Sequence, residues 1–146
     1  MGPRAKIAAC LAVFLLLAAN GAPREDSGGA DYKNVVTLLE AGQTVMGETI
    51  VYPQGAPARI TSLIVTMAPG EETGRHKHPV PTYGFILDGE LTVIYEGRGP
   101  RTYTKGQAFM EAEDVWHNGT NSGTSPARVL VVFMGADGIA DVARPQ

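Results

Sequence analysis

The sequence predicts an all-β fold, and three observations lead to this prediction. The chain has 146 residues and is 44% apolar, which is ordinary for one globular domain with its own core. After an N-terminal segment, short β-branched stretches with alternating apolar residues follow one another closely. Turns that contain glycine or proline separate them, and no long amphipathic helical pattern interrupts the series. We therefore expect an antiparallel β-sandwich or barrel.

The N-terminal segment has the pattern of a secretory signal peptide. Arg4 and Lys6 precede the apolar residues 7–19, and small residues follow up to Ala22. An uncleaved membrane anchor is the alternative, but the apolar run is shorter than the ~20 residues that span a bilayer. We expect residues 1–22 to be removed and the mature protein to be periplasmic or secreted, with no stable membrane insertion after cleavage.

Charge and cysteine content restrict the partners of the mature chain. Cleavage would remove the single cysteine, Cys10, so the mature protein could not form a disulfide bond. It would also remove two positive charges from a chain whose formal net charge is already −3. An acidic chain with no block of lysine or arginine is poorly suited to nucleic acid or anionic membranes. We expect a small molecule as the partner and no nucleic acid.

The chain after the cleavage site is expected to hold one domain. Residues 23–33 are rich in glycine and charge and predict a flexible linker, followed by a single domain over residues 34–140. Residues 35–45 could form a helical turn or a first strand. Asp88-Gly89 is typical of a tight hairpin turn. Strands are expected at residues 58–67, 83–87, 91–95, 101–104, 115–120 and 128–134.

Two histidines one residue apart are the first candidates for a metal site. In an extended segment, His76 and His78 project from the same face and can reach one ion together. His117 lies on a separate predicted strand, which a barrel could bring to the first pair. These three are all the histidines of the sequence.

The spacing around the histidines resembles that of the cupin superfamily, in a small single-domain form. The first cupin motif is matched in its spacing by Gly70, His76, His78, Thr82 and Gly89, and the second by Gly106, His117 and Asn121. The resemblance covers residues 43 to 135 and implies an antiparallel jelly-roll barrel with a metal inside. The family normally carries glutamate where this chain has Thr82, and proline and glycine where it has Ala112 and Asp114.

The resemblance implies that His76, His78 and His117 bind a divalent transition metal. Iron is expected ahead of zinc, nickel, manganese or copper, all of which imidazoles can bind, and a metal-free polar cluster is the alternative. With Thr82 in place of the glutamate, the centre resembles the three-histidine iron centres of thiol dioxygenases, and we expect no carboxylate in it. The nearest acids are usually exposed on turns, and we expect none of them to serve as a replacement: Glu71, Glu72, Glu111 and Glu113.

Four further residues are candidates for the surroundings of the metal or the substrate pocket. Thr82 is expected to bond to the backbone or to a metal-bound water. Tyr83 could face the cavity or the outer wall, and Trp116 is expected in the cavity wall or core because an indole buries a large apolar area. Asn121 is expected to fix the turn after His117 or to orient that histidine.

Two classes of function are compatible with these features. Three neutral ligands would leave a divalent ion its full charge, which favours an anionic or chelating substrate. The first hypothesis is therefore an oxygenase-type enzyme whose small substrate coordinates the ion. The alternative is a non-catalytic module that binds a small ligand, because the fold does not choose a reaction. A homodimer is compatible with both.

Overall fold

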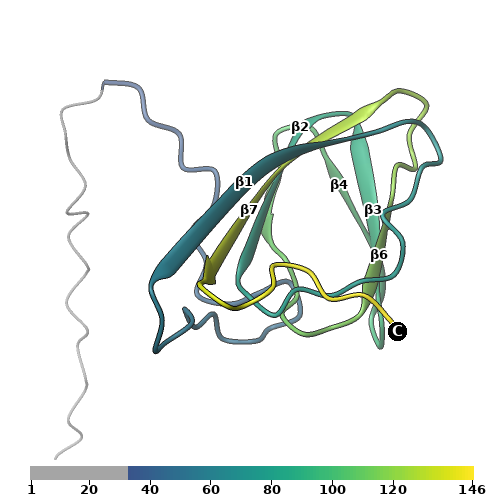
Figure 1. Cartoon of the computed structure of the whole chain (residues 1–146). Helices are drawn as coiled ribbons and strands as arrows, with labels where there is room; N and C mark the ends of the chain where they lie inside the picture. The colour runs from purple at the N-terminus through teal and green to yellow at the C-terminus, as the bar shows by residue number, and fades with distance from the viewer. Residues whose placement is uncertain (1–32) are drawn as a thin grey trace, which may run out of the picture. The chain divides into compact units, whose positions relative to one another are not determined.

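Seven antiparallel strands form two sheets that face each other (Figure 1). The computed structural model describes residues 33–146, and residues 36–146 make up one unit. The expected signal peptide and almost all of the expected linker lie outside the described residues. Within the described part, no helix has the length and hydropathy needed to cross a membrane. The predicted all-β fold is confirmed, and its architecture is that of a jelly-roll barrel.

The larger sheet has the order β1-β7-β2-β5 and the smaller sheet the order β4-β3-β6. Each predicted strand is present with ends shifted by a few residues at most, whereas β5 was not predicted. Residues 35–45 form neither a helix nor a named strand. The strands are β1 (Ala58–Met67), β2 (Thr82–Asp88), β3 (Glu90–Tyr95), β4 (Gly99–Thr104), β5 (Ala108–Met110), β6 (His117–Thr120) and β7 (Ala127–Ala136).

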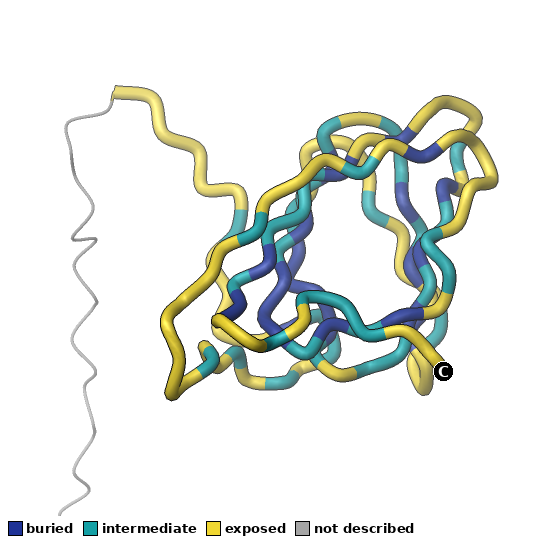
Figure 2. Tube along the Cα trace, in the orientation of Figure 1, coloured by how far each residue is buried: buried dark blue, intermediate teal, exposed yellow. Residues whose placement is uncertain are grey.

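The core lies between the two sheets, and buried positions alternate with more exposed ones along β2 and β3 (Figure 2). On β3, Leu91, Val93 and Tyr95 are buried, while Ile94 between them is half exposed. On β2 the buried positions are Thr82, Gly84 and Ile86. The neighbours Phe85 and Leu87 therefore face the outer side of the sheet, where they are only partly buried.

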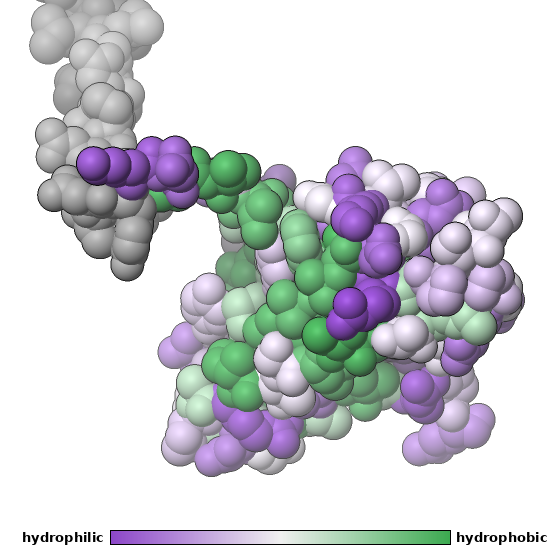
Figure 3. Space-filling model, turned by 90° about the horizontal axis from the view of Figure 1, so that it is seen from above, coloured by the Kyte–Doolittle hydropathy of each residue, from purple (hydrophilic) through white to green (hydrophobic). Residues whose placement is uncertain are grey.

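Strand β1 is the edge of the larger sheet and carries exposed apolar side chains. It pairs over its whole length with β7, but has no strand on its other side among the described residues. Ile60, Leu63 and Ile64 are 60%, 40% and 50% exposed, and Figure 3 shows apolar surface gathered on one face of the molecule. Apolar edge strands are typical of surfaces that another chain covers. The expected homodimer stays a prediction.

Asn121 ties the end of β6 to the end of β1. Its Nδ2 donates to the carbonyl oxygens of Met67 and Ser125, both at 2.9 Å, and its Oδ1 accepts from the Gly123 amide at 3.0 Å. The side chain is fully buried. Asn121 thus fixes the turn after β6, and the strand that carries His117 is anchored at its far end.

Asn121→Ala is expected to lower the free energy of unfolding by about 2–3 kcal/mol, because each buried polar group left without a partner costs about 1–3 kcal/mol. Urea unfolding of the metal-free protein measures this loss. Asn118→Ala is the matched control, since Asn118 Nδ2 makes an exposed bond to Glu72 Oε2. The control should stay within about 0.5 kcal/mol of the parent. Equal losses in the two variants would contradict the anchoring role of Asn121.

Gly89→Ala is expected to destabilise the β2–β3 hairpin by about 3 kcal/mol, from a strained backbone and a steric clash together. Gly89 has φ of 71°, and an added Cβ would lie 2.8 Å from Ala127 Cα and from the Pro126 carbonyl oxygen. Gly97→Ala separates the two causes, because Gly97 has φ of 82° but open space around it. Its cost in urea unfolding should be only about 1–2 kcal/mol. A loss at Gly89 no larger than at Gly97 would show that the clash is relieved.

Candidate metal centre

His76 and His117 are brought together by a pair of reciprocal backbone hydrogen bonds. The His76 amide donates to the His117 carbonyl at 2.9 Å, and the His117 amide donates to the His76 carbonyl at 2.8 Å. The segment that precedes His76 runs antiparallel along β6, with a further amide bond from Thr73 to Gly119 at 2.9 Å. Because the two histidines are direct cross-strand partners, their side chains leave the backbone on the same face.

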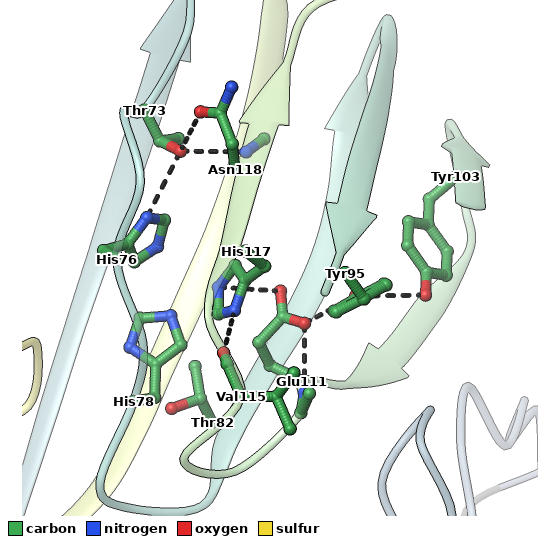
Figure 4. A network of polar contacts seen from close by, with 12 residues as sticks. Thr73, His76, His78, Thr82, Tyr95, Tyr103, Glu111, Val115, His117 and Asn118 are labelled. Atoms are coloured by element: carbon green, nitrogen blue, oxygen red, sulfur yellow. Dashed lines mark hydrogen bonds and ion pairs between the residues drawn. The ribbon is translucent and has the colours of Figure 1, made fainter. Parts of the chain in front are cut away.

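His78 joins them through the alternation of an extended segment. Lys77, between the two histidines, exchanges two backbone hydrogen bonds with Ala143 at 3.0 and 2.9 Å, so the segment is held on both sides. His76 and His78 then point into the barrel, while Lys77 points outward to a salt bridge with Asp114 at 2.8 Å. The imidazole centroids lie 4.4 to 5.1 Å apart (Figure 4). The structure therefore brings the three predicted histidines together.

Each imidazole is oriented by a backbone carbonyl. Nδ1 lies 2.7 Å from the Gly74 oxygen in His76, 2.9 Å from the Asp141 oxygen in His78 and 2.8 Å from the Val115 oxygen in His117. A carbonyl oxygen only accepts, so each Nδ1 must carry a proton. In a neutral ring this leaves Nε2 with its lone pair, and such a hydrogen bond is what orients a metal-binding histidine.

Burial keeps the three rings neutral. Desolvation lowers the pKa of His78 to about 4, although its hydrogen bond to the Asp141 carbonyl opposes the shift. It lowers the pKa of His76 and His117 as well. The rings are at most 9% exposed. At neutral pH the centre therefore presents unprotonated nitrogens, the form in which histidine binds metal.

The cluster fits a divalent transition metal. One ring nitrogen from each histidine lies within 4.8 Å of the others. His117 Nε2 is buried and makes no hydrogen bond in the described structure. A buried nitrogen lone pair without a partner is costly, and a metal ion would satisfy it. Two nitrogens that bind one ion at about 2.1 Å each are at most about 4.2 Å apart, so small adjustments of the rings suffice.

Glu111 is a buried carboxylate beside the cluster, and the expectation that it would be an exposed acid on a turn is wrong. It is 7% exposed, and its Oε2 lies 3.9 Å from His117 Nε2. The β2–β5 register pairs Tyr83 with Met110, which puts Glu111 opposite Thr82, and the Glu111 amide donates to the Thr82 carbonyl at 2.7 Å. The overlooked signal was an acid two residues after the buried Phe109, just past the end of a strand, β5, that had not been predicted.

Two donors hold the other oxygen of Glu111. The Tyr95 hydroxyl donates to Oε1 at 2.5 Å, and the Ala112 amide donates to the same atom at 3.1 Å (Figure 4). Burial raises the pKa of Glu111 to about 6, while the hydrogen bond from Tyr95 opposes the shift. Burial, together with the nearby Glu111 charge, raises the pKa of Tyr95, so this phenol stays a donor. Oε1 is thereby fixed, and Oε2 is the oxygen that faces His117.

Thr82 occupies the position where the family motif carries glutamate. Its side chain is 2% exposed and donates from Oγ1 to the Val80 carbonyl at 2.9 Å, which is the backbone bond expected for it. Thr82 lines the cavity with the three histidines. Its hydroxyl is thus used by the backbone, while its cross-strand neighbour Glu111 brings a carboxylate to the same wall.

Tyr83 and Trp116 lie away from the cavity. The expectation that Trp116 lines the cavity is therefore wrong, and of the two orientations left open for Tyr83 the structure has the outward one. Each is next to a residue that points inward, and side chains alternate along a strand. Tyr83 lines a separate hollow with Tyr52, Met110 and others. Trp116 lies beneath Arg75, whose guanidinium carbon is 4.3 Å from the indole centroid. Asn121 is likewise absent from the described cavity lining and acts in the turn.

A cavity of about 340 Å³ lies against the three histidines. Its walls are mainly apolar, and they include Leu91, Val93 and Phe109 from the core. Arg144 is the one lysine or arginine on the described lining, and its Nη1 donates to the Thr73 carbonyl at 3.2 Å. The arrangement can hold a small molecule next to an ion, against walls that are mainly apolar.

Comparison with solved structures finds barrels of the same kind in several enzymes. The DMSP lyase DddQ from Ruegeria pomeroyi DSS-3 is 27% identical with a TM-score of 0.50, over 57% of this chain and 42% of that one. Oxalate decarboxylase from Lactobacillus farciminis is 21% identical with a TM-score of 0.50, over 57% and 26%. A variant of salicylate 1,2-dioxygenase from Pseudoaminobacter salicylatoxidans is 19% identical with a TM-score of 0.48, over 54% and 23%. The chain thus spans less than half the length of each.

No curated protein matches the chain. A family model does match it over residues 63–133, and its description is a cupin domain. That range begins in β1, ends in β7 and contains all three histidines. With the barrel and the histidine cluster, this match makes the protein a member of the cupin superfamily, with a candidate metal centre inside the barrel.

Proposed function

We propose that this protein is a metal-dependent enzyme of the oxygenase type that acts on a small chelating or anionic molecule. The observation that carries the proposal is the set of three buried, neutral imidazoles at the cavity wall, each with its Nδ1 bonded to a backbone carbonyl. Such orientation before any ligand arrives is typical of sites that bind metal tightly. A polar cluster without that purpose would leave His117 Nε2 buried at a cost.

The cofactor that we propose is a divalent transition metal, with iron ahead of zinc, nickel, manganese or copper. Bound by His76, His78 and His117, it would supply Lewis-acid chemistry and, in the case of iron, redox chemistry. The chain itself orients the ligands, lines the cavity with mainly apolar walls and places the Glu111 carboxylate beside the centre. A carboxylate in hydrogen-bonding distance of a substrate can also take up a proton.

The cavity supports a small substrate with a negative group. Its volume of about 340 Å³ is at the lower end of ligand pockets, which run from about 300 to 1,000 Å³. Arg144 offers a guanidinium on the exposed part of the lining. Two acids on the same lining have partners of their own: Glu71 Oε2 accepts from the Ala68 amide and Glu72 Oε2 from Asn118. Neutral donors leave both carboxylates charged, so Arg144 is the single group on the described lining whose charge would attract an anion.

The likeness to the DMSP lyase supports an enzymatic role on a small molecule, without transferring its reaction to this chain, of which the match covers 57%. The alternative remains a non-catalytic cupin that captures a small ligand.

We further propose that cleavage after residue 22 delivers the protein to the periplasm or outside the cell, with membrane anchoring as the alternative. A homodimer and the absence of nucleic-acid partners complete the proposal.

The first prediction is that the protein binds a transition metal. The full chain, expressed without a polyhistidine tag and purified, should contain about one equivalent by mass spectrometry, because three oriented imidazoles lose little entropy on binding. The double variant His76→Ala/His117→Ala should contain almost none. Retention of metal by this variant would place the ion elsewhere on the chain. If the parent takes up no iron, nickel, zinc, manganese or copper offered anaerobically, the metalloenzyme proposal fails and ligand capture becomes the leading account.

The second prediction concerns turnover. Oxygen uptake in a screen of small thiols, enols and carboxylates should depend on His117 and disappear in His117→Ala, while Arg75→Gln, on the outer surface over Trp116, should leave it unchanged. Tight binding of one of these compounds to the metal-loaded protein without any chemical change would favour the ligand-binding module instead. The two readouts, oxygen consumption and binding heat, separate the hypotheses.

A further inference from the structure

Thr82 and Glu111 are direct neighbours across the β2–β5 ladder. The register that pairs Tyr83 with Met110 and Gly84 with Phe109 continues by one step to this pair, and the 2.7 Å bond from the Glu111 amide to the Thr82 carbonyl shows the step. Cross-strand neighbours have their Cβ atoms on the same face, about 4.5–5.5 Å apart. A carboxylate on either residue therefore starts from nearly the same point of the cavity wall.

The two oxygens of Glu111 are placed differently. Oε1 accepts hydrogen bonds from the Tyr95 hydroxyl and the Ala112 amide, and it is thereby held in one position. Oε2 lies 3.9 Å from His117 Nε2 on the wall of the cavity. An ion bound at about 2.1 Å to each of two atoms requires them to be no more than about 4.2 Å apart. The observed distance meets this requirement for an ion shared with His117. Among the described residues, the group of ligand atoms within 4.8 Å of one another comprises the three histidines alone, so the Glu111 side chain would have to turn toward His76 and His78 to share their ion.

The surroundings of Glu111 supply hydrogen bonds but no compensating charge. Its described partners are a phenol, an amide and the neutral ring of His117, and no lysine or arginine pairs with it among the described residues. A buried ionised carboxylate is costly unless it is paired or bound to a metal. The same ion that would satisfy the lone pair of His117 Nε2 would pair with this carboxylate.

We propose that Glu111 is a fourth metal ligand through Oε2, so that the carboxylate lost from position 82 on β2 is supplied instead from the end of β5. The inference rests on the proposed function and deepens it. The centre then has three imidazoles and one carboxylate, and a divalent ion keeps one positive charge rather than two. A neutral or singly anionic chelating substrate suits such an ion better than a strongly anionic one.

The test compares metal affinity in variants of the full chain, measured by Co²⁺ titration against a chelator and by the visible spectrum of bound Co²⁺. Glu111→Gln and Glu111→Thr should each weaken binding by about 100-fold or more, since even partners beyond the ligands are worth about 10–100-fold. The exchange variant Thr82→Glu/Glu111→Thr should return the affinity to within about 10-fold of the parent and restore the parent spectrum. The exchange variant tests whether metal affinity depends on the presence of a carboxylate at this part of the wall, and not on whether position 82 or position 111 supplies it.

Matched controls keep the outcomes apart. Glu113→Gln removes a nearby acid that contributes no atom to the described cavity lining, and it should leave affinity and spectrum unchanged. Tyr95→Phe removes a donor to Oε1 and a 3.4 Å contact with the Tyr103 hydroxyl, but it leaves Oε2 in place, so its loss should be smaller than that of Glu111→Gln. If the parent binds Co²⁺ and Glu111→Gln binds it equally with the same spectrum, the inference is wrong while the proposed function stands. If the exchange variant folds but restores neither readout, the inference is also overturned. If the parent binds no metal at all, the proposed function itself fails.

Discussion

The centre depends on the reciprocal backbone hydrogen bonds between His76 and His117. These two bonds join a segment with no regular strand of its own to β6, and they set the register that every other contact of the centre follows. With His76 opposite His117, alternation places His78 on the same face and sends Lys77 outward, where it bridges to Asp114. A slip by one residue would turn the paired imidazoles out of the barrel. Asn121, buried at the far end of β6, holds that strand against such a slip.

The electrostatics of the centre follow from burial. Three imidazoles and one carboxylate are buried close to one another, and burial disfavours the charged form of each group. For the imidazoles this produces the state that binds metal. For Glu111, burial disfavours the ionised form, which is the form that binds metal. The hydrogen bonds from the Tyr95 hydroxyl and the Ala112 amide offset this cost only in part. A bound cation would stabilise the neutral imidazoles and the ionised carboxylate at once. The three histidines and Glu111 are therefore satisfied by the same ion, although they come from different parts of the chain.

The sequence predicted the parts of this molecule that depend on local pattern. Alternation and turn residues indicated all strands but β5, and the spacing of His76, His78 and His117 indicated the cluster. Glu111 was missed because its position in the barrel depends on contacts between distant residues. It lies three residues after the start of β5, which no periodicity marks in the sequence, and only the pairing of β5 with β2 directs its side chain inward. Tyr83 and Trp116 show the complementary difficulty. Proximity in sequence to Thr82 and His117 suggested the pocket, whereas alternation along the strand sends their side chains to the other side.

The carbonyls that orient the three rings differ in where they come from. Gly74 and Val115 each lie two residues before the histidine that they bond, so these contacts form within a single turn of chain. Asp141, the partner of His78, is 63 residues away in the sequence. Two rings are thus set by local geometry, while the third acquires its orientation only when the segment around Asp141 docks beside Lys77. The orientation of His78 therefore depends on the packing of distant parts of the chain, and a local opening of the segment around Asp141 would remove the hydrogen bond that orients this ring.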